Sequence, residues 1–236
     1  MFTLFFVDDL PTTVGAHYEF ANEDANHAIR VLRMQPGAEF MLSDGNGAWS
    51  QVKAIEVSKK SMQVQVIDSG FQEALATTIT VVQALPKGDR SKEAIELLTE
   101  AGVDRIVPWA ATRSIGKGTD KFAITAREAS KQSRRFRIPQ VSDIATTTQI
   151  CEAIKLSDLA IVFHESATQK LSDQISSHNV QNLLIIIGPE GGITDEELAA
   201  FQGAGAKVAL MGRPILRSAH AGIAAVSAVS ALLKVW

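Results

Sequence analysis

The sequence has little cysteine and no long apolar run, and each shortage excludes a class of protein. The one cysteine, Cys151, rules out an internal disulfide and any zinc site made of several cysteines. The longest uninterrupted aliphatic run is Leu183–Ile187, far shorter than the ~20 apolar residues that a transmembrane helix needs. The first residues, MFTLFFVDD, lack the basic start of a signal peptide and turn acidic at Asp8 and Asp9. We therefore expect a cytoplasmic protein, with 236 residues for one large core or two modest ones.

Acidic residues are scarce in one segment, although the chain as a whole has a net charge of −3. Eight basic and two acidic residues lie from Arg113 to Arg137, a net charge of +6 that leaves −9 for the rest. Lys131–Arg137 (KQSRRFR) contains no acid, whereas a solvated helix face usually interleaves both signs. The asymmetry favours a surface that binds a polyanion, and a solvated helix face is the alternative.

Two domains are expected, with a boundary between residues 72 and 73. Residues 1–72 contain short β-branched or alternating runs of strand length, a short helical pattern at Asn22–Leu32 and a hairpin turn at Asp44–Gly47. From Thr78 onward strands alternate with helices, which predicts an α/β domain with a mostly parallel sheet over residues 73–236. Thr194–Glu197 matches a capping box and predicts a helix start just after a glycine loop.

Two glycine-marked loops carry the clearest functional signal of the residues themselves. IGPEGGIT (187–194) and LMGRPILRSAHAG (210–222) each follow a buried-strand pattern, where α/β folds place ligands. They lack the phosphate-binding P-loop and dinucleotide spacings, and Glu190 would repel an anion. The pair predicts one pocket with two walls for a ligand other than a nucleotide phosphate. Ile215 and Leu216 are placed to sandwich a flat apolar ring, and Arg217 to stabilise a developing anion. Taken singly, Gly212 is more often only a turn residue and Arg217 only a surface cation.

Four motifs, in this order and spacing, resemble the RsmE family of SPOUT-class methyltransferases, which methylate N3 of a uridine in 16S ribosomal RNA. They are LPKGDRSKEAIELLTEAGVDRIVP (85–108), EASKQSRRFRIPQV (128–141), IGPEGGIT and LMGRPILR. HAIRVLR (27–33) and the later DGNG turn are similar to that family's PUA-like RNA-binding domain. The resemblance implies a PUA-like β-barrel followed by a SPOUT α/β domain with a deep trefoil knot, an exception to the rule that chains do not thread loops.

The resemblance also implies a cofactor and an assembly. S-adenosylmethionine would bind bent within the knot, without a metal, and a homodimer would complete each active site. The cofactor-binding residues implied are His164, Glu165, Ile187, Gly188, Pro189, Gly191, Leu210, Met211, Gly212, Ile215 and Leu216.

Catalytic roles are expected for three residues. Arg217 is the candidate for stabilising the anionic edge of uracil, through preorganised charge in a dry pocket. Glu190 and His220 are candidates for the base, and a structural role is the alternative for both. His220 lies in Ser218-Ala219-His220-Ala221, where family members often have a Thr-Glu-Thr-Ala type sequence, so the role of the missing acid is open.

The RNA partner, a small ribosomal subunit or its 16S RNA, is expected to lie across basic residues that position it through phosphates. Those residues are Arg30, Arg33, Lys87, Arg90, Arg127, Lys131, Arg134, Arg135 and Arg137. Two alternatives stay open: a SPOUT methyltransferase that acts on another RNA site, and a non-catalytic RNA-binding or ribosome-assembly factor. A nucleotide-dependent enzyme is disfavoured because the phosphate motifs are missing.

Overall fold

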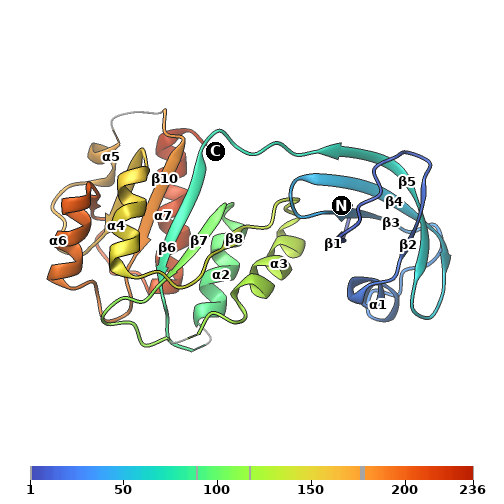
Figure 1. The fold of residues 1–236 in the computed structure, drawn as a ribbon, viewed down its shortest axis with the longest axis horizontal. Helices are drawn as coiled ribbons and strands as arrows, with labels where there is room; N and C mark the ends of the chain where they lie inside the picture. Colours follow the sequence, from blue (N-terminus) through green and yellow to red (C-terminus); the bar gives the residue numbers. More distant parts are fainter. Residues whose placement is uncertain (1, 89, 117, 176–178, 236) are drawn as a thin grey trace. The chain divides into compact units, whose positions relative to one another are not determined.

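The computed structural model describes residues 2–88, 90–116, 118–175 and 179–235, and the chain divides into two compact units (Figure 1). The first unit comprises Met1–Ala74 together with Ser130–Ile138, and the second comprises Leu75–Ala129 and Pro139–Trp236. The division at Ala74 lies close to the expected boundary between residues 72 and 73. The inclusion of Ser130–Ile138 in the first unit is a difference, because the sequence pattern places that segment inside the α/β domain.

The first unit is a five-stranded curled sheet with one short helix. The strands are β1 (Leu4–Phe6), β2 (His17–Phe20), β3 (Glu39–Ser43), β4 (Ala48–Val57) and β5 (Met62–Phe71), in the order β1-β3-β4-β5-β2. The predicted turn joins β3 to β4 as an antiparallel hairpin, with Gly45 and Gly47 at φ of 77° and 112°. Helix α1 (Glu23–Arg30) begins after Asn22, whose side chain accepts the N–H of Ala25.

Aromatic packing explains why Ser130–Ile138 belongs to the first unit. The ring of Phe136 stacks on Trp49, with ring centres 5.8 Å apart. The Arg137 Nε donates a hydrogen bond to the Gln72 carbonyl at 2.9 Å, and its guanidinium lies 5.1 Å from the centre of the Phe71 ring. Because these partners lie some 65 to 90 residues apart in the chain, no local pattern indicated the contact.

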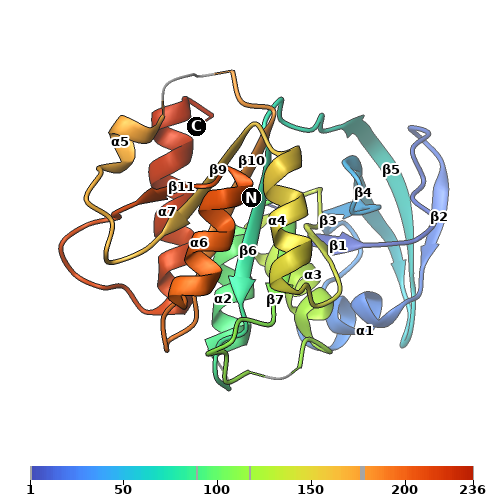
Figure 2. The same ribbon diagram turned by 60° about the vertical axis from the view of Figure 1, so that its left-hand side comes forward.

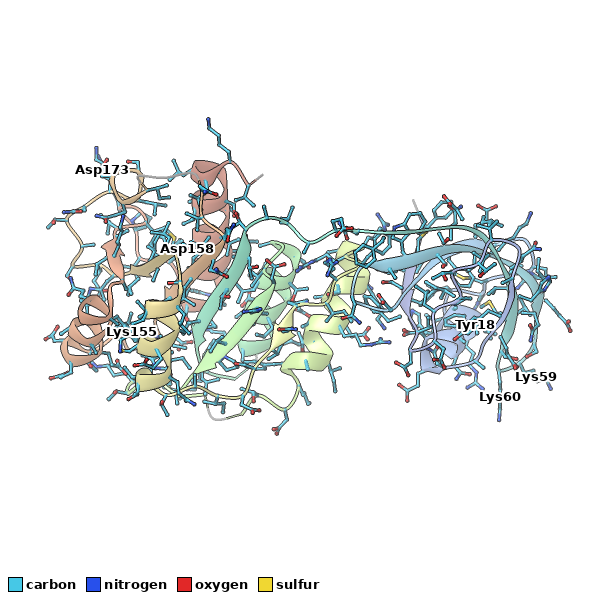
Figure 3. All side chains as sticks on the ribbon, turned by 45° about the horizontal axis from the view of Figure 1, so that its top comes forward. Tyr18, Lys59, Lys60, Lys155, Asp158 and Asp173 are labelled. Atoms are coloured by element: carbon cyan, nitrogen blue, oxygen red, sulfur yellow. The ribbon has the colours of Figure 1, made fainter. Side chains whose placement is uncertain are left out.

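The second unit contains a six-stranded sheet in which every ladder is parallel, as the alternating pattern predicted. Its order is β11-β9-β10-β6-β7-β8. The strands are β6 (Thr78–Ala84), β7 (Arg105–Trp109), β8 (Gln140–Val141), β9 (Leu159–Phe163), β10 (Asn182–Ile187) and β11 (Lys207–Ala209). At the amino edge, Asp158, labelled in Figure 3, accepts the backbone N–H groups of Gln181 and Asn182 and so aligns β10 with β9.

Helices cover both faces of this sheet (Figures 1 and 2). Six belong to this part of the chain: α2 (Arg90–Glu100), α3 (Phe122–Ser133), α4 (Thr147–Leu156), α5 (Leu171–Gln174), α6 (Asp195–Ala204) and α7 (Ser218–Leu233). In β10, Leu183, Ile185 and Ile187 pack into the core of α2 and α7, while alternate residues pack against α4 and α6. A strand buried on both faces needs a continuous apolar run, which is why LLIII marks it.

The predicted capping box at the start of α6 is confirmed. The Thr194 side chain accepts the N–H of Glu197, and the Glu197 side chain accepts the N–H of Thr194. None of the described helices is long and apolar enough to cross a lipid bilayer. The deep trefoil knot implied by the resemblance stays a prediction.

Candidate active site

A cavity of about 670 Å³ opens among three loops that follow β9, β10 and β11. Because the strands are parallel, their carboxyl ends meet at one edge of the sheet, and the loops that leave them are neighbours. The lining comprises residues 163–165, 187–193 and 210–218, with Ala221. This volume lies in the range of small-molecule and cofactor sites, about 300–1,000 Å³.

The first loop keeps its shape through close backbone packing at Gly188. A Cβ at this position would lie 2.7 Å from Cγ1 of Ile193, which is buried at the other end of the same loop. Any side chain would therefore push the loop away from the start of α6. The glycine is needed for the fold of this wall as well as for access to the cavity.

A buried serine ties this wall to the second one. The Ser218 hydroxyl donates to the Gly188 carbonyl at 2.8 Å and accepts the Gln83 Nε2–H group at 2.9 Å. Gln83 is fully buried on β6. One hydroxyl thus joins the glycine loop, the first residue of α7 and the middle of the sheet. Sequence reasoning missed this role, although Ser218 directly follows the ILR motif.

The third wall is formed by His164 and Glu165. The backbone N–H of Ser166 donates to His164 Nδ1 at 3.2 Å, and the Ser166 hydroxyl lies 2.8 Å from the same ring nitrogen. The His164 side chain is 10% exposed, and Nε2 lies 3.8 Å from Glu165 Oε2. The imidazole is thereby held in one orientation beside a carboxylate that is largely open to the cavity and solvent.

All eleven residues expected to bind the cofactor line this one cavity. They are His164, Glu165, Ile187, Gly188, Pro189, Gly191, Leu210, Met211, Gly212, Ile215 and Leu216. Ile215 is 81% exposed and Leu216 is 39% exposed, so the second loop keeps its apolar side chains partly open. Their contact with a cofactor stays a prediction.

The three catalytic candidates occupy different places. Arg217 lines the cavity at the start of α7, and its guanidinium makes no hydrogen bond or ion pair with any residue that the structure describes. Glu190 also lines the cavity, but its Oε1 accepts the Lys87 N–H at 3.3 Å and lies 3.6 Å from Arg90 Nη1. His220 is not among the lining residues, and its Nε2 lies 3.1 Å from Glu93 Oε1 on α2.

The predicted RNA-binding residues are split between the two units. Lys87 and Arg90 adjoin the cavity through Glu190, and Arg127 lies on α3 in the second unit. In the first unit, Arg30, Arg33 and Arg134 are exposed, whereas Arg135 and Arg137 are partly buried.

Lys131 is largely enclosed by the first unit. Its Nζ lies 2.7 Å from Asp24 Oδ1, and both side chains are only 11% exposed. A lysine of the acid-free stretch 131–137 is therefore paired with an acid of α1 that lies 107 residues earlier in the chain.

Glu197, which the sequence indicated only as part of a capping box, also joins the start of α6 to the loop after β7. Its Oε1 accepts both the N–H and the hydroxyl of Thr112, at 2.8 and 2.9 Å, while its Oε2 accepts the N–H of Thr194 at 3.0 Å. The carboxylate is buried but fully hydrogen-bonded, which is what a buried charge requires. The capping-box pattern located Glu197; only the tertiary contact reveals its second partner.

Comparison with known proteins agrees with this architecture. Residues 73–230 match the model of an RNA methyltransferase domain, and residues 20–67 match the model of an RNA methyltransferase PUA domain. The ribosomal RNA small subunit methyltransferase E of Mycobacterium bovis is 35% identical over 99% of this chain and 93% of its own length. The chain belongs to this RNA methyltransferase family.

Two further relatives extend the match within the family. The ribosomal RNA small subunit methyltransferase E of Bacillus subtilis is 27% identical over 95% of this chain and 91% of its own length. The crystal structure of the Neisseria gonorrhoeae protein of the same name, bound to S-adenosylmethionine, covers 98% of both chains with a TM-score of 0.87 at 24% identity. The resemblance to the RsmE family, and the expected arrangement of a PUA domain followed by an α/β methyltransferase domain, are therefore confirmed.

Proposed function

We propose that this protein transfers the methyl group of S-adenosylmethionine to N3 of a uridine in 16S ribosomal RNA of the small subunit. The observation that carries the proposal is the cavity at the carboxyl edge of the sheet. Its lining includes Arg217, whose guanidinium makes no hydrogen bond or ion pair with the described residues. The relatives named ribosomal RNA small subunit methyltransferase E support the substrate, and the S-adenosylmethionine-bound structure supports the cofactor.

The cavity residues fit the chemical character of this cofactor. Apolar side chains of Ile187, Leu210 and Met211 suit an adenine ring, and backbone groups of the glycine loop suit its polar edge. Glu165, 59% exposed at its side chain, places a carboxylate where a positively charged group would be favoured. When bound, S-adenosylmethionine supplies an electrophilic methyl group on a positively charged sulfur.

Within this proposal the protein stabilises the negative charge that develops on uracil and supplies no side chain as a base. Uridine N3 becomes nucleophilic as its proton leaves, and negative charge then spreads over the neighbouring carbonyl oxygens. Arg217 is placed to stabilise that charge because its donors are not occupied by other described residues. Glu190 is engaged by Lys87 and Arg90, and His220 points to Glu93, so the N3 proton passes to water.

We also infer a cytoplasmic homodimer. Leu210, Ile215 and Leu216 are exposed apolar side chains at the cavity, between 38% and 81%, and a second subunit would remove them from water. Size-exclusion chromatography with light scattering tests this directly, and a monomer at micromolar concentration would contradict it.

The enzymatic proposal is tested with small ribosomal subunits from cells that lack the modification. The wild-type protein should transfer a methyl group to a single uridine, and mapping of the base should place it on N3. Binding of the cofactor measured by calorimetry separates an enzyme from a bare RNA-binding factor. Methylation of another RNA, or at another atom, would favour the alternative SPOUT methyltransferase.

Arg217 provides the sharpest variant. Arg217→Ala should lower kcat by about 10²–10³-fold, the usual loss of one charge-stabilising donor, with little change in cofactor affinity. Arg217→Lys keeps the charge but not the planar donors and should recover part of the rate. Full activity of Arg217→Ala, or a comparable loss in His220→Ala, would refute this assignment.

A further inference from the structure

Three loops at the carboxyl edge of the sheet are joined by direct contacts into one platform. The loop after β6 meets the glycine loop through the Lys87 N–H and Glu190 Oε1, 3.3 Å apart. The loop after β7 meets the loop after β6 through the Gly116 N–H and the Leu85 carbonyl, 3.4 Å apart. It also meets the glycine loop through Arg113, whose Nη1 donates to the Gly191 carbonyl at 3.1 Å.

Arg113 packs against the glycine loop at Gly191, where the absence of a side chain leaves room for it. A Cβ there would lie 2.9 Å from Arg113 Cβ and 3.3 Å from the Arg113 carbonyl oxygen. Since Gly191 also lines the cavity, Arg113 contacts a residue of the cavity wall. Its Nη1 and Glu165 Oε1 lie 3.7 and 3.9 Å from where a Cβ of Gly192 would be.

Most of the hydrogen-bonding capacity of Arg113 is not used by the residues that the structure describes. Its guanidinium has five N–H donors, and among these residues only its Nη1 group donates, to the uncharged carbonyl of Gly191. The side chain is exposed and forms no ion pair with the residues described here. Nearby acids are Glu165 and Glu196; the pKa of Glu196 is lowered by its own backbone N–H and by Thr194, with Arg113 contributing less.

Arg113 thus presents a permanent charge beside the cavity, on the same platform as Lys87 and Arg90. A planar guanidinium matches a phosphate group through paired hydrogen bonds, better than a lysine does. We propose that Arg113 binds a backbone phosphate of the RNA strand that carries the target nucleotide. Through the Gly191 carbonyl, the same side chain positions the glycine loop against that strand.

This inference rests on the proposed function and is tested on the full-length protein. Arg113→Met removes the charge and keeps the bulk; Arg113→Lys keeps the charge. Arg105→Met is the matched control, because Arg105 is an exposed arginine at the amino end of β7, whereas Arg113 lies in the loop that follows the carboxyl end of this strand. Thermal unfolding of each variant checks that the fold is retained.

The readouts are the affinity for unmodified small ribosomal subunits at several salt concentrations, KM and kcat, and the cofactor affinity from calorimetry. Arg113→Met should raise the RNA KM about tenfold and reduce the slope of log affinity against log salt by about 0.7–0.9, the value of one phosphate contact. Arg113→Lys should restore the slope, and Arg105→Met should leave it at the wild-type value.

An unchanged salt slope in Arg113→Met would overturn the inference, and a loss of cofactor affinity alone would show a purely structural role for the side chain. An equal change of slope in Arg105→Met would also overturn it. Failure of the proposed function is a separate result, because it would appear as absence of methyl transfer by the wild-type protein. The binding slopes are measured without that reaction.

Discussion

Removal of the buried carboxylate of Glu197 should destabilise the second unit and weaken its cofactor site together. Glu197 is 5% exposed and accepts the backbone N–H groups of Thr112 and Thr194 as well as the Thr112 hydroxyl. In Glu197→Ala the buried Thr194 N–H loses its acceptor in the protein interior, whereas the N–H of Thr112, an exposed residue, becomes open to water. These two donors join the loop after β7 to the start of α6, immediately after the glycine loop.

The magnitude follows from these two donors. An unsatisfied buried N–H costs about 1–3 kcal/mol, and the hydrogen bonds lost at the exposed Thr112 add about 1 kcal/mol, so the free energy of unfolding should fall by about 3 kcal/mol. For a domain of roughly 150–250 residues, this corresponds to a fall in Tm of about 6–12 °C. Thr194→Ala is the control, because it removes the helix cap and leaves the Thr112 contact; it should cost only ~1 kcal/mol.

The measurement is thermal and urea unfolding of the three proteins, followed by calorimetry with S-adenosylmethionine at a temperature where all are folded. Glu197→Ala should bind the cofactor more weakly than Thr194→Ala does, since the start of α6, which follows the glycine loop, loses its contact with Thr112 in the loop after β7. Equal stability losses in the two variants would refute the reasoning, because the contact with Thr112 would then contribute nothing.

Two further predictions concern residues whose contacts the structure reveals. Lys131→Met should lower the stability of the first unit by about 1–3 kcal/mol in chemical denaturation, because the buried Asp24 carboxylate loses its ion pair with Lys131 and keeps the hydrogen bond from the Phe6 N–H. Asp24→Asn/Lys131→Met should recover part of the loss. If Lys131 instead acts mainly on RNA, the single variant would keep its stability and lose salt-dependent RNA binding. Ser218→Ala should weaken S-adenosylmethionine binding about tenfold in calorimetry, because it frees the Gly188 carbonyl and Gln83, whereas Ser218→Thr keeps the hydroxyl. Unchanged affinity in Ser218→Ala would show that the two walls hold their spacing without this bridge.

Features with a local cause were predictable from the sequence. The capping box needs only Thr194 and Glu197, three residues apart, and the hairpin turn needs only the glycines of Asp44–Gly47. The buried strand β10 was visible because a strand covered on both faces is apolar throughout. Short strands such as β2 and β8 were missed, since pairing with a distant strand, rather than their own composition, makes them strands.

The candidate site divides in the same way. The glycine loops and the ILR motif located the cavity, because parallel strands bring their carboxyl ends to one edge. The partners of its charged residues were not predictable: Glu190 with Arg90, His220 with Glu93, and Lys131 with Asp24 are separated by about 100 residues or more. Periodicity and spacing report on neighbours along the chain and carry no information about such pairs.

The sequence by itself therefore determined the class of fold, the position of the ligand-binding edge and the family of this protein. The tertiary structure alone decided which charges remain available for chemistry. Glu190, His220 and Lys131 are engaged by distant partners, whereas Arg217 and Arg113 keep donors beside the cavity that no described residue uses. The physical reason is that a side chain forms hydrogen bonds with the polar groups that the fold brings within about 3 Å of it, and these groups can come from any part of the chain.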